Sequence, residues 1–330
     1  MSETSYALPG PSINPDGSDT AGIADSINTT RSNIWFEDGN IIFQAQMTQF
    51  RVHKGILGRH SSVFKDMLSV PQPSGEITSE GFPIVHLADR PEDWQNVLIT
   101  LYDGSLKAYK SVDNMAFSMA ESLLRLGKKY EFDNLYGLAI ENFRATRPRT
   151  LDLWEKKYIG QKRPNSTTFH DFDLVNLLVD SGIKSLLPTS LYACLEGYSL
   201  EEILRGSTRL DGTPVHLSPN TQITLVLGKE KLLKSTTEYI QDWLTTEGIC
   251  SDPVYCGPSK ARCLAFMVRY PFLPNAVVSP YLLDLTRKAS AFCDTCKRVM
   301  CDKIEVGREK LWDELPGFFS LQGWADLEDN

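Results

Sequence analysis

The stretch His53-Lys-Gly-Ile-Leu-Gly-Arg-His-Ser-Ser-Val-Phe-Lys-Asp-Met-Leu68 decides the fold of the first half of the chain. It contains three adjacent pairs of apolar residues at the spacing of a helix face. The pairs are Ile56-Leu57, Val63-Phe64 and Met67-Leu68. Gly58 interrupts the run, and Ser61 or Ser62 is placed to cap a second helix after it. The stretch therefore predicts two short helices that pack against each other.

The sequence around this stretch predicts a small sheet and three further helices. Gln49–Val52 alternates polar and apolar residues, as a strand does, and a polar turn around Gln46 joins it to an earlier apolar run. A loop rich in Pro, Ser and Gly follows the helix pair. The expected strands are 41–45, 49–52 and 83–87, and the expected helices are about 91–102, 115–130 and 135–143.

The central stretch resembles the heart of the BTB/POZ domain, a protein–protein interaction module. The matching residues are His53, Ile56, Leu57, Ser61, Phe64 and Leu68. Two flanking motifs are similar as well, namely Asp89 with Trp94, Leu98 and Leu101-Tyr102-Asp103-Gly104, and Leu124-x-x-Gly127-x-Lys129-Tyr130-x-Phe132-x-x-Leu135. The resemblance covers residues 33–147. It implies an α+β protein in which an N-terminal BTB/POZ fold, a small sheet with surrounding helices, precedes a mostly α-helical C-terminal region.

The resemblance also implies partners. Domains of this family self-associate or recruit other proteins, and they serve transcriptional regulators and cullin-type ubiquitin ligases. We therefore expect a non-enzymatic interaction module that acts as a self-associating protein, an adaptor or a regulatory scaffold. Family members that bind a cullin often carry an apolar-x-Glu motif after the helix pair, whereas Glu76 here follows the polar Ser74 by two positions. We expect weak or no cullin binding.

The opening of the domain, Ile34-Trp35-Phe36-Glu-Asp-Gly-Asn40, is similar in character to BTB proteins of mushroom-forming fungi. Ile34, Trp35 and Phe36 are three bulky apolar residues in a row, and the segment before the first strand packs on the partner chain in many dimeric BTB domains. These three residues are our interaction candidates for a homodimer. The alternative is that Trp35 and Phe36 fold back on their own domain. Where the family has an Asp at the first strand, this chain has Asn40.

Composition limits the classes of protein that this chain can represent. It has 330 residues, of which 42% are hydrophobic, so it can form one large or two ordinary globular domains. A net charge of −8 argues against binding to a nucleic-acid backbone. No apolar run approaches the roughly 20 residues that span a bilayer, and no secretory signal pattern is present. Seven cysteines, an odd number, indicate reduced thiols in the cytoplasm or nucleus.

Changes in composition divide the chain into three parts. Residues 1–32 contain only isolated aliphatic residues among polar ones, which predicts a disordered N-terminal tail. The BTB/POZ domain is assigned to 33–147, and the polar stretch Arg144–Thr150 marks the boundary. Residues 148–330 are expected to form the helical C-terminal region, with expected helices 151–158, 173–179, 188–197, 218–244, 258–270 and 280–308.

Six of the seven cysteines lie after residue 249, which raises the question of zinc. Cys293-Asp-Thr-Cys296 has the spacing of a ligand pair, whereas Cys256 and Cys263 are seven positions apart. These four cysteines are the zinc candidates. The favoured interpretation is reduced thiols on helices, with no cofactor. A zinc-stapled C-terminal binding domain remains an alternative.

No nucleophile–base pair, carboxylate pair or phosphate-binding loop stands out, so no catalytic residue is assigned. His170-Asp-Phe-Asp173 immediately precedes an expected helix, where Asp171 and Asp173 would serve as cap and first-turn charges. Trp312, Phe318, Phe319 and Trp324 are expected to anchor the C-terminal segment in a core. The alternative to an interaction protein is an enzyme whose active site lies in residues 148–330. It stays open because catalytic groups can converge from distant positions without a local motif.

Overall fold

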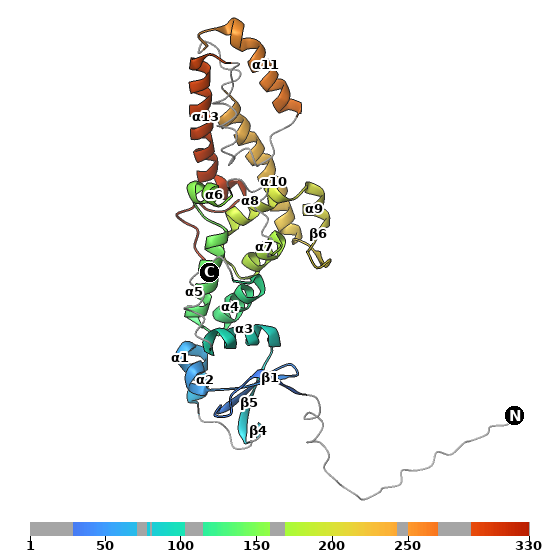
Figure 1. The fold of residues 1–330 in the computed structure, drawn as a ribbon, viewed down its shortest axis with the longest axis vertical. Coiled ribbons are helices and arrows are strands. Elements are labelled where there is room, and N and C mark those ends of the chain that lie inside the picture. The colour runs from blue at the N-terminus through green and yellow to red at the C-terminus, as the bar shows by residue number, and fades with distance from the viewer. Residues whose placement is uncertain are drawn as a thin grey trace, which may run out of the picture.

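The computed structural model describes residues 29–70, 78–79, 81–102, 115–158, 169–242, 250–269 and 292–329. The molecule is elongated, with a small sheet at one end, α4, α5, α7 and α8 in the middle, and α11 and α13 at the opposite end (Figure 1). Most of the predicted disordered tail, residues 1–28, lies outside the described residues. Within the described ranges, no helix is long and apolar enough to cross a membrane.

A mixed five-stranded sheet forms the base of the N-terminal domain. Its strand order is β1-β3-β2-β5-β4, in which β1 runs parallel to β3 and β2 runs parallel to β5. β2 and β3 form the predicted antiparallel hairpin, in which Phe43 lies opposite Phe50. The bounds are β1 Thr30–Trp35, β2 Ile41–Ala45, β3 Thr48–Val52, β4 Thr78–Ser79 and β5 Phe82–Leu87.

Strand β1 differs from the expectation, because it begins at Thr30, inside the stretch assigned to the tail. The register between β1 and β3 shifts between Arg31 and Trp35, which marks an irregularity in the ladder. There the Ser32 hydroxyl accepts a hydrogen bond of 3.0 Å from the Ile34 N–H. The sequence did not predict the start of this strand, because the residues of β1 before Ile34 are all polar and show no alternation of polar and apolar side chains.

The two short helices predicted from the central stretch are confirmed. They are α1 (Lys54–His60) and α2 (Ser62–Ser69). Ser61 separates them, and its hydroxyl caps α2 by accepting a hydrogen bond of 3.0 Å from the Phe64 N–H. The same hydroxyl donates to the Tyr130 carbonyl at 2.5 Å, which ties the helix pair to the C-terminal end of α4.

The described residues of the N-terminal domain contain three more helices, as predicted. Trp94 is fully buried between the sheet and these helices, and its ring meets Phe43 edge-on at a centroid distance of 5.1 Å. Phe64 stacks on Tyr130 at 5.1 Å in the same cluster. The bounds are α3 Pro91–Tyr102, α4 Phe117–Lys129 and α5 Asp133–Thr146.

The remainder of the chain is mostly helical, as predicted. Its bounds are α6 Leu151–Tyr158, α7 Asp171–Asp180, α8 Leu187–Gly197, α9 Leu200–Arg205, β6 Ser207–Thr208, β7 Pro214–Val215, α10 Pro219–Thr236, a π-helical turn Thr237–Gln241, α11 Pro253–Arg269, α13 Asp294–Asp313 and α14 Leu315–Phe318. α11 begins five residues earlier than expected and contains Pro258. The stretches 159–168 and 270–291 lie outside the described residues, including the first part of the helix expected at 280–308.

The predicted aromatic anchor near the C-terminus is confirmed. Trp312, Phe318 and Phe319 are buried, and Trp324 packs against them. The Trp312 indole donates to the Arg149 carbonyl at 2.9 Å, and the Trp324 indole donates to the Trp312 carbonyl at 2.9 Å. The end of the chain is therefore fixed to the segment that follows α5.

Two charged residues near the domain boundary have roles that the sequence did not predict. Arg147, part of the polar stretch assigned to the boundary, is buried and forms an ion pair with buried Asp171. The cap of α7 is His170, whose Nδ1 accepts a hydrogen bond from the Phe172 N–H. Asp171 and Asp173 both lie in the first turn of α7, as predicted, but Asp171 is a buried partner of arginine and not the capping residue. A tertiary contact decides both roles, and local sequence does not reveal it.

Candidate functional site

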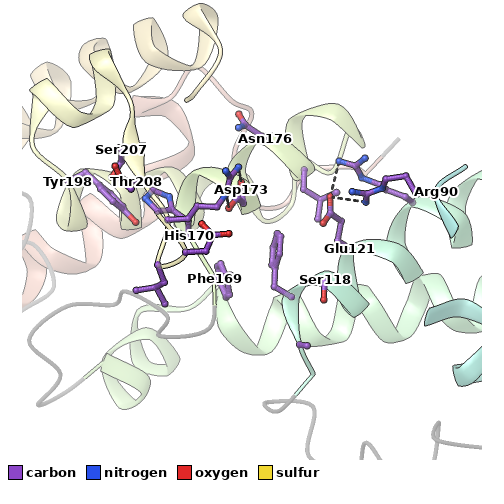
Figure 2. A pocket seen from close by; sticks show the side chains of 17 residues that line it. Arg90, Ser118, Glu121, Phe169, His170, Asp173, Asn176, Tyr198, Ser207 and Thr208 are labelled. Atoms are coloured by element: carbon purple, nitrogen blue, oxygen red, sulfur yellow. Dashed lines mark hydrogen bonds and ion pairs between the residues drawn. The ribbon is translucent and has the colours of Figure 1, made fainter. Parts of the chain in front are cut away.

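A cleft of about 920 Å³ lies where the N-terminal domain meets the helical region (Figure 2). Arg90, which precedes α3, and residues of α4 form one wall, and residues of α7, the end of α8 and the β6–β7 hairpin form the other. The lining residues are Arg90, Ala116, Phe117, Ser118, Glu121, Arg125, Phe169, His170, Asp173, Asn176, Leu177, Tyr198, Ser207, Thr208, Arg209, Leu210 and Asp211.

The wall from the N-terminal domain carries one carboxylate between two arginines. Glu121 lies one turn before Arg125 on α4, and their charged atoms are 2.9 Å apart. Arg90, just before α3, approaches Glu121 to 4.0 Å and also binds Asp93 through two hydrogen bonds of 3.0 Å. Burial raises the pKa of Glu121 above its usual value, although both arginines oppose this shift.

The opposite wall carries a second arginine–carboxylate pair. Arg209 in the β6–β7 turn binds both oxygens of Asp173, at 2.7 and 2.8 Å. The fork of the guanidinium matches the two carboxylate oxygens, which gives this contact a fixed geometry. Arg209 also donates to the Pro214 carbonyl at 2.8 Å, so the pair holds the hairpin against α7.

His170 occupies a structural position in the cleft. Its Nδ1 accepts a hydrogen bond of 3.2 Å from the Phe172 N–H, and its ring packs against Tyr198 at a centroid distance of 4.9 Å. Burial lowers the pKa of His170, which favours the neutral ring that this cap requires. The nitrogen that would act as a base is thus engaged by the backbone.

An aromatic pair forms the apolar part of the cleft. Phe117 of α4 stacks on Phe169 at a centroid distance of 5.1 Å with an interplanar angle of 23°. One ring comes from each side, so the pair also joins the two parts of the chain. The exposed Leu210 lies at the rim of the cleft, on the hairpin turn.

The charged groups of the cleft differ in their exposure to solvent. The side chains of Arg90 and Arg125 are 54% and 46% exposed, whereas those of Glu121 and Asp173 are 20% and 21% exposed. The carboxylates therefore lie beneath the arginines that they neutralise. Because arginine has five N–H donors, a half-exposed guanidinium keeps donors available for a second acceptor. This arrangement can bind a ligand carboxylate beside an apolar side chain.

The interaction candidates at the start of the domain pack largely on their own domain. Ile34 is buried, and Phe36 stacks on Tyr102 at a centroid distance of 4.3 Å. Trp35 is half-buried, with the Arg31 guanidinium 4.4 Å from its ring centroid. Phe36 therefore folds back on its own domain, as the alternative predicts, whereas Trp35 remains partly accessible to solvent.

His53 and Asn40 organise the junction between β3 and α1. The His53 side chain lies between the Tyr102 hydroxyl, 3.1 Å from Nδ1, and the carboxylate of Asp38, 3.1 Å from Nε2. The Asn40 side chain accepts a hydrogen bond of 2.8 Å from the Lys54 N–H at the start of α1. The substitution of Asn for the family's Asp thus preserves an acceptor at this helix end.

The structure brings three of the four cysteine candidates together. Cys256, Cys293 and Cys296 converge, and Cys250 joins them in place of Cys263. The sequence prediction named Cys263 instead of Cys250 as the fourth ligand candidate. Cys250 lies in the segment that precedes α11, and its spacing from the other cysteines does not mark it as a ligand. The cleft itself was missed by sequence analysis, since its residues come from five separate segments and carry no local motif.

Comparison with known proteins agrees with the geometry of the N-terminal domain. No curated protein and no solved structure matches the chain. The family model described as BTB/POZ domain matches residues 33–145, the part that contains the sheet from Ile34 onward, the helix pair and α3 to α5. The match covers the first wall of the cleft, whereas α7 and the β6–β7 hairpin lie beyond it. Residues 33–145 therefore form a BTB/POZ domain, a general protein–protein interaction module.

Proposed function

We propose that this protein is a non-enzymatic adaptor that binds a partner segment in the cleft between its BTB/POZ domain and its helical region. The segment that fits is extended and carries an Asp or Glu side chain next to an apolar one. The carboxylate would contact Arg90 and Arg125, and the apolar side chain would cover Phe117 and Phe169. The observation that carries this proposal is that the two arginines are more than twice as exposed as the carboxylate of Glu121 that lies between them.

The titratable groups of the cleft support binding over catalysis. Glu121 and Asp173 are each engaged by arginine, and the Nδ1 of His170 caps a helix. A general base must have a free lone pair within reach of the proton that it removes. An enzyme would therefore need catalytic residues other than Glu121, Asp173 and His170.

The two walls are held in fixed relation, which supports a preorganised binding surface. Arg147 and Asp171 form a buried ion pair across the boundary, and Lys128 of α4 donates to the Ser181 carbonyl at 2.7 Å. A preformed cleft spares a ligand the cost of ordering both sides.

A charge-reversal experiment tests the proposal. The full chain carrying Arg125→Glu, with Arg144→Glu as the matched control, is purified with its bound proteins from cells of the source organism at native expression. Arg144 is an exposed arginine on the neighbouring α5 and does not line the cleft. We expect Arg125→Glu to deplete at least one bound protein tenfold or more while Arg144→Glu retains it. Equal sets of bound proteins for both variants and the wild type would contradict the proposal.

Self-association of the BTB/POZ domain is a second proposal, supported by strand β1. β1 is an edge strand of the described sheet, and Trp35 lies on it half-buried. An accessible edge can pair with a second copy of the chain. The register irregularity in β1 limits the length of ladder that such a pairing can extend.

Three further points of the proposal rest on sequence alone. We expect weak or no cullin binding, and Ser74 and Glu76, on which that prediction depends, lie outside the described residues. A cytoplasmic or nuclear location follows from the expected reduced thiols. The likeness of the segment Ile34–Asn40 to BTB proteins of mushroom-forming fungi also remains a prediction.

A further inference from the structure

Four cysteine side chains meet where α11 and α13 begin, at the end of the molecule opposite the sheet (Figure 1). The sulfur atoms of Cys250, Cys256, Cys293 and Cys296 all lie within 4.8 Å of one another. Two segments supply them, one from each side of the stretch 270–291. The cluster is remote from the cleft and takes no part in the proposed adaptor function.

The spacing of the sulfur atoms fits a single tetrahedral ion. A Zn–S bond of about 2.3 Å places the sulfurs of a regular tetrahedron about 3.8 Å apart. The sulfurs of Cys250 and Cys293 are 3.9 Å apart, close to that edge. A disulfide bond joins only two sulfurs, at about 2.0 Å, so it would leave the convergence of four unexplained.

Two backbone N–H groups donate to sulfur atoms of the cluster. The Cys293 N–H donates to the Cys256 sulfur at 3.1 Å, and the Cys296 N–H donates to the Cys293 sulfur at 3.5 Å. Cys293 is the N-cap residue of α13, and Cys256 lies in the first turn of α11. The partial positive charge at both helix N-termini therefore faces the four sulfurs, and metal binding requires them as thiolates.

The start of α11 needs such an anchor, because the described side chains of this helix make little apolar contact. Of the α11 side chains described, only Cys256 and Ser259 are buried. Val254 is 89% exposed and Tyr255 is 52% exposed. Helical turns that bury no apolar side chain gain little from packing, so another interaction must hold the first turns of α11 in place. A bound metal supplies that interaction where a core is missing.

We propose that Cys250, Cys256, Cys293 and Cys296 bind one Zn²⁺ ion that fixes α11 to the start of α13. All four coordination positions are filled by protein thiolates, so the site is structural and leaves no open position for a substrate. Zn²⁺ suits a tetrahedral set of four sulfur ligands. Binding displaces the remaining thiol protons to solvent, and no oxidation takes place.

Elemental analysis of the purified full chain tests the proposal. We expect about one zinc per chain after expression with added zinc and removal of loosely bound metal, as four thiolates imply. Cys256→Ser and Cys296→Ser should each lose most of this zinc. The matched controls are Cys263→Ser on α11 and Cys301→Ser on α13, which should retain it, because neither residue belongs to the cluster.

A second measurement keeps the test decisive if the cluster variants fail to fold. Mercurial modification of the wild-type thiols, followed with a zinc indicator dye, should release one equivalent of zinc. Less than a tenth of an equivalent by both methods would overturn the proposal. Stoichiometric iron would overturn the assignment to Zn²⁺. An intact mass that shows disulfide bonds among these cysteines in the natively purified chain would also overturn it.

Discussion

Arg147 and Asp171 form an ion pair in which each side chain is only 1% exposed. Arg147 follows α5 directly and Asp171 opens α7, so the pair joins the BTB/POZ domain to the helical region. Burial raises the pKa of Asp171, and the Arg147 charge opposes that rise. Breaking a buried pair leaves one charge without compensation, which costs far more than the intact pair contributes.

Replacing Arg147 should therefore destabilise the protein strongly. We expect Arg147→Met to lower the free energy of unfolding by about 3–5 kcal/mol, because Asp171 would remain buried without its partner. Urea denaturation of the full chain measures this loss. The control is Arg144→Met, an exposed arginine one turn earlier on α5, which should change stability by less than about 0.5 kcal/mol. Adding Asp171→Asn to Arg147→Met should recover part of the loss, and an additive double variant would contradict a direct pairing.

The raised pKa of Glu196, near the C-terminal end of α8, predicts how the stability of the protein depends on pH. Burial raises the pKa of Glu196 to about 7 in the folded protein, while its ordinary value is 4.5. The folded state therefore binds more protons than the unfolded state between these values, so stability is highest at low pH and falls as pH rises through about 7. From pH 5 to pH 8, the wild type should lose on the order of 2 kcal/mol more than Glu196→Gln. If the free energy of unfolding of the wild type and of Glu196→Gln changed equally between pH 5 and pH 8, the raised pKa of Glu196 would be contradicted.

Gly127 and Gly137 form a matched pair of tests for the packing of α4 on α5. A Cβ at Gly127 would lie 2.9 Å from the Tyr136 backbone nitrogen, whereas a Cβ at Gly137 would meet nothing within 4 Å. Gly127→Ala should lower stability by about 1–3 kcal/mol through forced separation of the helices. Gly137→Ala should instead raise it by about 0.5–1 kcal/mol through helix propensity. Thermal unfolding of both variants checks the signs, and a stabilising Gly127→Ala would refute this packing.

The sequence predicted the BTB/POZ part well because its signals are local. Ser61 caps α2 and the apolar pairs around it face a core, and both features depend on residues a few positions apart. The roles of Arg147 and Cys250 depend on partners in distant segments, to which no local pattern points. Arg147 stands in a polar run next to Pro148, which is typical of a linker. Cys250 precedes Cys256 by six positions, outside the usual spacing of a ligand pair, so the cluster could be recognised only in three dimensions.

Trp35 is the residue through which to test self-association. If two copies pair through β1, light scattering of the full chain at tens of micromolar should give twice its mass of 37.1 kDa. Trp35→Ala should shift the protein towards the monomer while the chain stays folded, because the wild-type ring is only half-buried. Phe36→Ala is less suitable, since it also removes the stacking on Tyr102. A wild-type chain that stays monomeric would end this proposal.

Site-specific photo-crosslinking in the source cells tests the adaptor proposal most directly. A photoreactive amino acid is placed at Thr208, an exposed residue on the rim of the cleft, or at Glu230, an exposed residue of α10 outside it. We expect a crosslinked protein at Thr208 that is absent at Glu230, and we expect Arg125→Glu in the same chain to abolish it. Equal crosslinking at both positions, or a Thr208 product that persists with Arg125→Glu, would contradict the assignment of this cleft as the binding site.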